Sequence, residues 1–246
     1  MFGNVRGVGF MNNKAFTLVE LSIVLIIISL IVGGVIGGQS LVRSAKLNKL
    51  ISEITSYETS FNNFELQYDA MPGDFREASQ YWPTYAEPGG GAVDGDGDGQ
   101  IESRTNEYKL SSYHLHLADL IHPVYDPTGI FVTSKYGNNT VITINTSIII
   151  LGAGLLGLDN GSIDGKTSLN ISYFDSATAL GNKAILSPVD MISIDKKMDD
   201  GLPRAGKLVV LGILSSGPFS PSCIAVGDKY NLSTSEKICN ISYVLR

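Results

Sequence analysis

The sequence lacks an excess of basic side chains. Its 246 residues carry 18 Lys and Arg against 24 Asp and Glu, a formal net charge of −6. A chain with this balance is a poor electrostatic match to phosphate backbones, which disfavours general nucleic-acid binding. Long repeats and low-complexity linkers are also missing, so the chain after any membrane segment is expected to form a single domain.

Motifs of the common catalytic classes are missing as well. The sequence has no G-x-S-x-G, no H-E-x-x-H and no phosphate-binding loop. Two of its three histidines, His114 and His116, would point about 200° apart on a helix, which disfavours joint metal ligation. We therefore expect no enzyme activity and interpret the histidines as surface or packing residues.

Charge is absent from Leu21 to Gly38. A helix of about 18 to 20 apolar residues spans the ~30 Å of hydrocarbon in a bilayer, so this stretch predicts a membrane segment. Glu20 lies just inside its N-terminal end, where an unpaired carboxylate costs up to about 3 kcal/mol and needs a partner. The sequence that follows, Gly37-Gly38-Gln39-Ser40-Leu41, lacks the A-x-A-like cleavage site of an ordinary secretory signal.

The sequence around this acid, Lys14-Ala15-Phe16-Thr17-Leu18-Val19-Glu20, resembles the class III signal of type IV pilins and type II secretion pseudopilins. In that family, prepilin peptidase removes a short basic leader on the cytoplasmic side of the membrane, and the new N-terminal amine is methylated. The resemblance implies processing between Ala15 and Phe16, with Ala15 where glycine is usual, and a leader of residues 1–15. Met11 is a second candidate start of that leader, and an uncleaved signal anchor is the alternative.

The resemblance also implies a role in assembly. Glu20 would neutralise the freed amine of Phe16 on a neighbouring subunit, inside a filament core of packed helices. The precursor would lie in the bacterial inner membrane with its body in the periplasm, before it joins a pilus or pseudopilus filament. In a pilus, the subunit would reach the cell surface. Its partners would be prepilin peptidase, copies of itself or related pilins, the assembly platform and the ATPase.

The function expected from this resemblance is that of a structural subunit of a type IV pilus-like filament. One alternative is a pseudopilin of a type II secretion system. The other is a membrane-anchored module for calcium-dependent binding or adhesion, which would not need cleavage of the leader.

The helix is expected to continue beyond the membrane segment. Apolar residues recur at steps of one, three or four, which places them on one stripe of an amphipathic helix: Leu47, Leu50, Ile51, Ile54, Tyr57, Phe61, Phe64 and Tyr68. Glu53 falls on the polar face. We expect a transmembrane or filament-core helix over 16–38, its amphipathic continuation over 39–71 and a globular extracytoplasmic body over 72–246.

The body is expected to pair helices with antiparallel strands. Patterns of period two and β-branched residues predict strands at 129–136, 140–151, 169–174, 207–214 and 238–245, and helical patterns predict helices at 105–121 and 189–198. Ser187 followed by proline is a typical helix start. The fold class is therefore α+β, a long N-terminal helix packed on an antiparallel β-sheet body, as in pilins.

Acidic residues alternate with glycine in one loop of the body. Carboxylates at alternate positions wrap around a hard cation, and calcium is the natural candidate. The expected ligands are Asp94, Asp96, Asp98, Gln100 and Glu102. The pattern departs from an EF-hand at Thr105, where the bidentate glutamate belongs, so a further ligand is expected from Glu107 or Asp74. A solvated acidic turn is the alternative.

Two regions near the C-terminus have more than one interpretation. The acidic string Ile194–Pro203 is interpreted first as a structural hairpin and second as another calcium site. Cys223 and Cys239, the only cysteines, are expected to pair because this part of the chain should be outside the cytoplasm. The bridge would close a loop of about 17 residues, worth about 3 kcal/mol in the chain-entropy model, and free thiols are the alternative.

Overall fold

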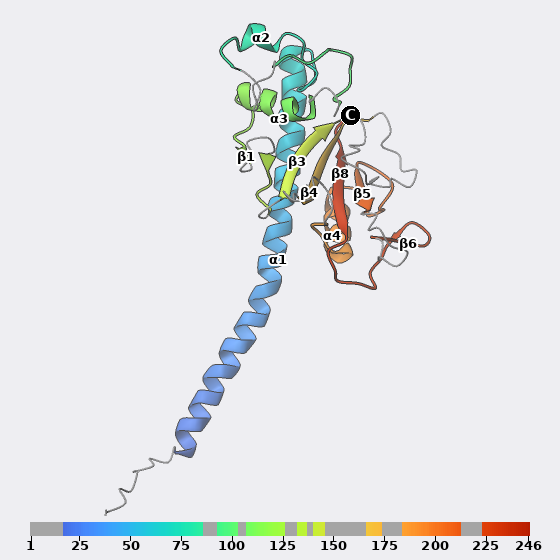
Figure 1. Ribbon diagram of the computed structural model, residues 1–246. Coiled ribbons are helices and arrows are strands. Elements are labelled where there is room, and N and C mark those ends of the chain that lie inside the picture. Colours follow the sequence, from blue (N-terminus) through green and yellow to red (C-terminus); the bar gives the residue numbers. More distant parts are fainter. Residues whose placement is uncertain are drawn as a thin grey trace, which may run out of the picture. The chain divides into compact units, whose positions relative to one another are not determined.

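The computed structural model describes residues 17–85, 93–102, 107–125, 132–136, 140–145, 166–173, 184–212 and 223–246. The chain divides into two compact units, Met1–Ala45 and Lys46–Arg246. One helix, α1 (Leu18–Tyr68), begins in the first unit and ends in the second (Figure 1).

The first unit contains the apolar part of α1. An 18-residue window of this helix has a mean hydropathy of 2.7, long and apolar enough to cross a membrane. Two of its serines form hydrogen bonds to the backbone of the preceding helical turn. Ser22 Oγ donates to the Leu18 carbonyl at 2.6 Å, and Ser29 Oγ donates to the Leu25 carbonyl at 2.7 Å. Such internal bonds satisfy polar groups that hydrocarbon cannot.

The second unit buries the stripe that the sequence predicts on α1. Leu50, Ile54, Phe61 and Phe64 have no exposed surface, and they join a core that continues into the sheet. Glu53 differs from the expectation of a solvated polar face, because only 8% of its surface is exposed. Its carboxylate accepts bonds from the Ser134 hydroxyl at 2.6 Å and the Lys135 amide at 2.9 Å, which the helical pattern alone does not reveal.

The larger sheet has six strands, all antiparallel to their neighbours, in the order β1-β2-β3-β4-β8-β5. The strands are β1 (Val124–Tyr125), β2 (Val132–Thr133), β3 (Thr140–Asn145), β4 (Ser168–Tyr173), β8 (Cys239–Val244) and β5 (Leu208–Gly212). Isoleucines stack across the centre, with Ile142 opposite Ile171 and Ile171 opposite Ile241. The long helix and the antiparallel sheet confirm the predicted α+β class, whereas the short β1 carried no sequence signal strong enough to predict it.

Short helices and a hairpin complete the described body (Figure 1): α2 (Ala78–Tyr81), α3 (Glu107–Leu117), α4 (Pro188–Met198), and the strands β6 (Ile224–Ala225) and β7 (Lys229–Tyr230). α4 starts as predicted, since the Ser187 side chain accepts a bond from the Asp190 amide and proline occupies the first turn. Neither α2 nor the hairpin of β6 and β7 was predicted, because segments this short leave no measurable periodicity.

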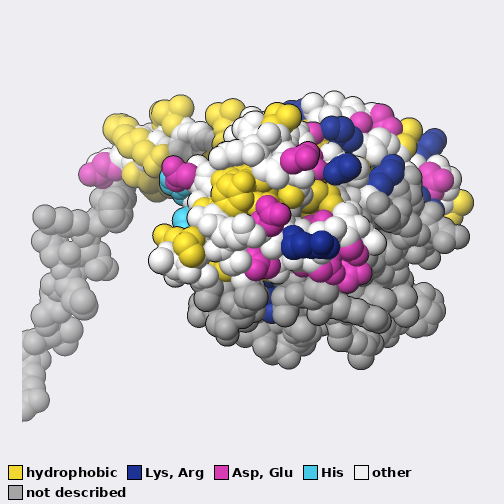
Figure 2. Space-filling view, turned by 90° about the horizontal axis from the view of Figure 1, so that it is seen from above, with side chains coloured by type: hydrophobic (Ala, Val, Ile, Leu, Met, Phe, Trp, Pro, Cys, Tyr) yellow, Lys and Arg dark blue, Asp and Glu magenta, His cyan; other side chains and the backbone are white. Residues whose placement is uncertain are grey.

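Charges of both signs are mixed over the body. On the face drawn in Figure 2, described Lys and Arg side chains lie among Asp and Glu side chains. Ion pairs link α1 to the C-terminal strands: Lys207 Nζ lies 2.7 Å from Glu58 Oε1, and Arg246 Nη1 lies 2.9 Å from Glu65 Oε1. Among the described side chains on this face there is therefore no separate basic field of the kind that binds phosphate backbones.

Candidate metal centre and processing segment

The acidic loop 93–102 is held by two carboxylates from outside it. Asp74, in the turn after α1, accepts bonds from the amides of Asp98 at 3.0 Å and Gly99 at 2.8 Å. Glu107, the first residue of α3, accepts bonds from the amides of Asp96 and Glu102, both at 3.0 Å. The loop is thus wrapped around two acids that are 6% and 1% exposed, respectively.

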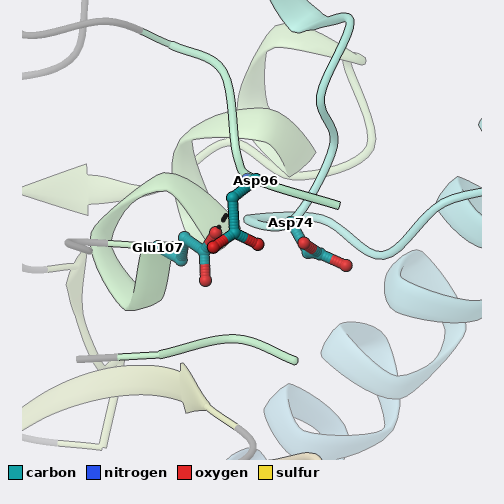
Figure 3. Close-up of side chains that lie close together, drawn as sticks. All are labelled: Asp74, Asp96 and Glu107. Atoms are coloured by element: carbon teal, nitrogen blue, oxygen red, sulfur yellow. Dashed lines mark hydrogen bonds between the residues drawn. The ribbon is translucent and has the colours of Figure 1, made fainter. Parts of the chain in front are cut away.

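Three carboxylates meet at this point. Asp74, Asp96 and Glu107 each offer an oxygen, and the three oxygens lie within 4.8 Å of one another. Figure 3 shows the three side chains side by side, with Asp96 coming from the loop and Glu107 from α3. Burial raises the pKa of Asp74, against the lowering by nearby backbone amides, and the Glu107 charge raises it further. A hard cation with oxygen ligands would relieve this repulsion.

Of the five ligands predicted from the sequence, the structure places only Asp96 in this group. Asp94 instead bonds to Ser79 in α2, with its two oxygens accepting bonds from the Ser79 amide at 2.6 Å and the Ser79 hydroxyl at 2.7 Å. Asp98 Oδ1 accepts from the Gln100 amide at 2.8 Å, within the loop. Gln100 is exposed and Glu102 is half-buried. The two extra ligands considered from the sequence, Glu107 and Asp74, are the ones the fold brings to Asp96.

The backbone around the group is packed too tightly for side chains. Gly95 lies against the backbone of Gly73 and Asp74, where an added Cβ would overlap the main chain. Gly73 itself has a φ of +103°, a conformation that favours glycine. Arg76 donates from its guanidinium to the Asp96 carbonyl, which fixes the loop from the other side. Glycines here serve close approach of two segments rather than simple flexibility.

His114 fastens the same two segments to α3. Its Nδ1 accepts a bond from the Gly73 amide at 2.9 Å, and its Nε2 lies 2.6 Å from the Val93 carbonyl. The ring is therefore neutral, with its proton on Nε2. Burial lowers the pKa of His114 to about 4, and its ring stacks on Phe64. A packing role for this histidine was predicted, but its contact with the loop was not, because its partners are 21 and 41 residues away.

The N-terminal segment contains a second arrangement, which was not predicted from the sequence. The Thr17 amide and hydroxyl donate to Glu20 Oε2 at 2.8 and 2.9 Å, and the Thr17 hydroxyl accepts from the Glu20 amide at 3.2 Å. This is a capping box, which starts α1 at Leu18. The Thr-x-x-Glu spacing alone could have predicted it. Ala15 and Phe16, the predicted processing residues, lie outside the described residues.

The cysteines form one disulfide. Cys223 and Cys239 are bonded, with their Cα atoms 5.3 Å apart, and both are fully buried. The bridge joins the start of β6 to the start of β8, and the backbone of Cys239 also bonds to Leu186. The C-terminal loop is therefore tied to an inner strand of the sheet.

Comparison with known proteins gives one match. Residues 10–36 match the family described as the prokaryotic N-terminal methylation motif. No match was found among curated protein sequences, and none among solved structures. The matched segment contains the predicted processing residues and Glu20, together with most of the apolar part of α1.

Proposed function

We propose that this chain, which has a type IV pilin-like N-terminal segment, is the precursor of a structural subunit of a pilus-like filament. The observation that carries the proposal is a methylation motif on residues 10–36 that leads into an apolar, solvent-exposed helix. A helix with this composition needs either lipid or similar helices around it. Its work is mechanical rather than catalytic.

Each part of the chain has a role in this proposal. Prepilin peptidase removes residues 1–15 at Ala15, the helix 16–38 forms the membrane anchor and then the filament core, residues 39–71 continue the helix, and the body 72–246 covers the outside. The body is periplasmic in the precursor, and the ATPase and assembly platform drive polymerisation.

Glu20 has one carboxylate oxygen available for a neighbouring subunit. Both bonds from Thr17 fall on Oε2, and no residue in the described part of the chain donates to Oε1. One oxygen therefore starts the helix while the other is open to the methylated amine of Phe16 on the next subunit. A pair of this kind fixes register between subunits more than it adds stability.

The intact mass of the mature protein tests the processing step. A chain that starts at N-methylated Phe16 is expected when the protein is isolated from cells that contain prepilin peptidase. A mature chain that still carries Lys14 and Ala15 would refute both cleavage and the filament.

Two matched variants separate the roles of Glu20. Glu20→Gln keeps an oxygen for the capping box but loses the charge, whereas Thr17→Val loses the cap and keeps the charge. We expect filaments from Thr17→Val and none from Glu20→Gln, measured by electron microscopy of sheared surface fractions. Equal loss in both variants would mean that Glu20 acts only by capping the helix.

A pseudopilin of a type II secretion system is expected to share this processing. Deletion of the gene separates the two functions: loss of surface filaments with normal export of secreted enzymes supports the pilus, and the reverse result supports the pseudopilus. Adhesion by the isolated subunit without any need for Glu20 would instead favour the membrane-anchored binding module.

We also propose that Asp74, Asp96 and Glu107 bind calcium and thereby order the loop 93–102. The proposal rests on their converging oxygens and on the buried, mutually repelling carboxylates of Asp74 and Glu107. Asp96 is exposed, so Asp96→Asn should fold. We expect it to lower the thermal midpoint only with calcium present, while Glu102→Gln, outside the group, has little effect. An equal loss in chelator would contradict the site.

A further inference from the structure

A second group of acids lies at the end of α4, apart from the loop 93–102. Asp195 on the helix and Asp199 and Asp200 just after it each offer an oxygen, and the three oxygens lie within 4.8 Å of one another. Within the part of the chain that the structure describes, no Lys or Arg forms an ion pair with any of them. Three neighbouring carboxylates thus lack a compensating cation.

One oxygen of this group is buried without a partner. Asp195 has no exposed surface, and its Oδ2 accepts a bond from the Tyr230 hydroxyl at 2.6 Å. Its Oδ1 has no hydrogen-bond partner among the described residues. Buried carboxylate oxygens in native proteins are nearly always satisfied by a donor, a water or an ion, so this atom indicates that something else occupies the space beside it.

The other two acids each leave an oxygen open as well. Asp199 uses Oδ2 to accept bonds from the amides of Lys207 and Leu208, and Asp200 uses Oδ1 to accept from the Leu202 amide at 2.8 Å. Their remaining oxygens receive no bond from any described residue. The backbone therefore holds both carboxylates in place while one oxygen of each stays available.

The electrostatics of Asp195 favour a bound cation at this group. Burial raises the pKa of Asp195 to about 6, the Tyr230 hydroxyl and the Gly201 amide lower it, and the charges of Asp200 and Asp199 raise it again. Oδ1 nevertheless has no hydrogen-bond partner among the described residues. A cation bound between the three carboxylates would offset their mutual repulsion.

We propose that Asp195, Asp199 and Asp200 form a second calcium site, independent of the one at Asp96. Calcium suits the group because it takes six to eight oxygens in flexible geometry, so that water and backbone carbonyls complete the shell around three carboxylates. The ion would join the end of α4 to the start of β5 through Asp199. Through the Tyr230 bond to Asp195 it would also fix β7, and with it the hairpin that adjoins the disulfide.

Calcium titration of the full-length protein in detergent micelles tests this site. The background is Asp96→Asn, which disables the loop 93–102, and calorimetry with calcium chloride measures the remaining uptake. We expect a dissociation constant on the order of 0.1 to 1 mM, as in extracellular calcium modules. Asp195→Asn and Asp200→Asn should each weaken this affinity at least tenfold. Asp228→Asn, an equal charge change outside the group, should leave the affinity unchanged.

Two outcomes would overturn the proposal. The first is no calcium uptake by the Asp96→Asn protein up to 10 mM. The second is uptake that Asp195→Asn and Asp200→Asn leave unchanged. Asp200 is exposed, so its variant should fold even if the buried Asp195 variant does not. Because the background already lacks Asp96, failure of this site is distinguishable from failure of the first one.

Discussion

Acidification should destabilise the body through His114. The ring is neutral and buried, and its pKa is lowered from 6.5 to about 4 in the folded chain. The unfolded chain takes up the proton near pH 6.5 and the folded chain does not, so stability is full above pH 6.5 and is lost as the pH falls toward 4. Protonation would also place a second N–H against the Gly73 amide, which now donates to Nδ1.

The size of this effect follows from the difference between the ordinary pKa of 6.5 and the folded-state pKa of about 4. At 1.36 kcal/mol per unit, the full loss of unfolding free energy is about 3 kcal/mol. Between pH 7.5 and pH 5 the loss is about 2 kcal/mol, because most of the unfolded histidine is already protonated at pH 5. That is a large part of the stability of an ordinary domain.

Other groups also make the stability depend on pH, so the comparison needs a variant. Burial raises the pKa of Asp74 and of Asp195, and a raised carboxyl pKa gives stability below its unfolded value that is lost as the pH rises. These acids therefore oppose the His114 effect. His114→Gln keeps them and removes only the titrating ring, so the difference between the two proteins isolates the histidine.

The assay is urea unfolding of the full chain in detergent, followed by the fluorescence of its only tryptophan. Trp82 lies 6.0 Å from the His114 ring between centroids and reports directly on this cluster. The variant is expected to be less stable than the original protein at pH 7.5. The difference in unfolding free energy between the two proteins should be about 2 kcal/mol smaller at pH 5 than at pH 7.5. If the difference in unfolding free energy between the two proteins is the same at pH 7.5 and pH 5, the assignment of a buried neutral histidine is refuted.

Three further predictions concern single structural features. Reduction of the Cys223–Cys239 disulfide should lower the unfolding free energy by about 3 kcal/mol, and a double serine variant should be insensitive to reductant. Gly73→Ala should cost at least 1 kcal/mol, because φ is +103° and the added Cβ would lie 2.7 Å from a backbone oxygen of α3. Phe61→Ala should cost about 3 to 5 kcal/mol, since the ring is fully buried. Leu66→Ala, at a position 85% exposed on the same helix, should be nearly neutral, and similar losses at both positions would contradict the assigned face.

The sequence predicted the features that arise from local patterns. The buried stripe of α1, the Ser187 start of α4 and most of the described strands follow from periodicity and capping, which act over a few residues. The burial of Glu53 could not be predicted in this way, because its partners Ser134 and Lys135 are more than 80 residues away.

The candidate metal centre was also predicted only in part, for the same reason. The alternation of Asp and Gly predicted the loop and Asp96. The same spacing also predicted Asp94 as a ligand. In the structure, the Asp94 carboxylate instead accepts bonds from Ser79. This arrangement depends on how the turn after α1 packs against the loop. Long-range packing, which a single sequence does not display, selects which carboxylates converge.

The position of β8 determines when the body can fold. This strand comes last in chain order among the described strands, yet it lies between β4 and β5 and pairs with both. The sheet therefore cannot close until residues 239–244 have left the ribosome and, in the proposed topology, crossed the membrane. The anchor helix, made first, would hold an unfinished body at the membrane surface during that interval. Loss of residues 239–244 would remove an inner strand of this sheet, so synthesis of β8 sets the earliest moment at which a subunit is ready to assemble.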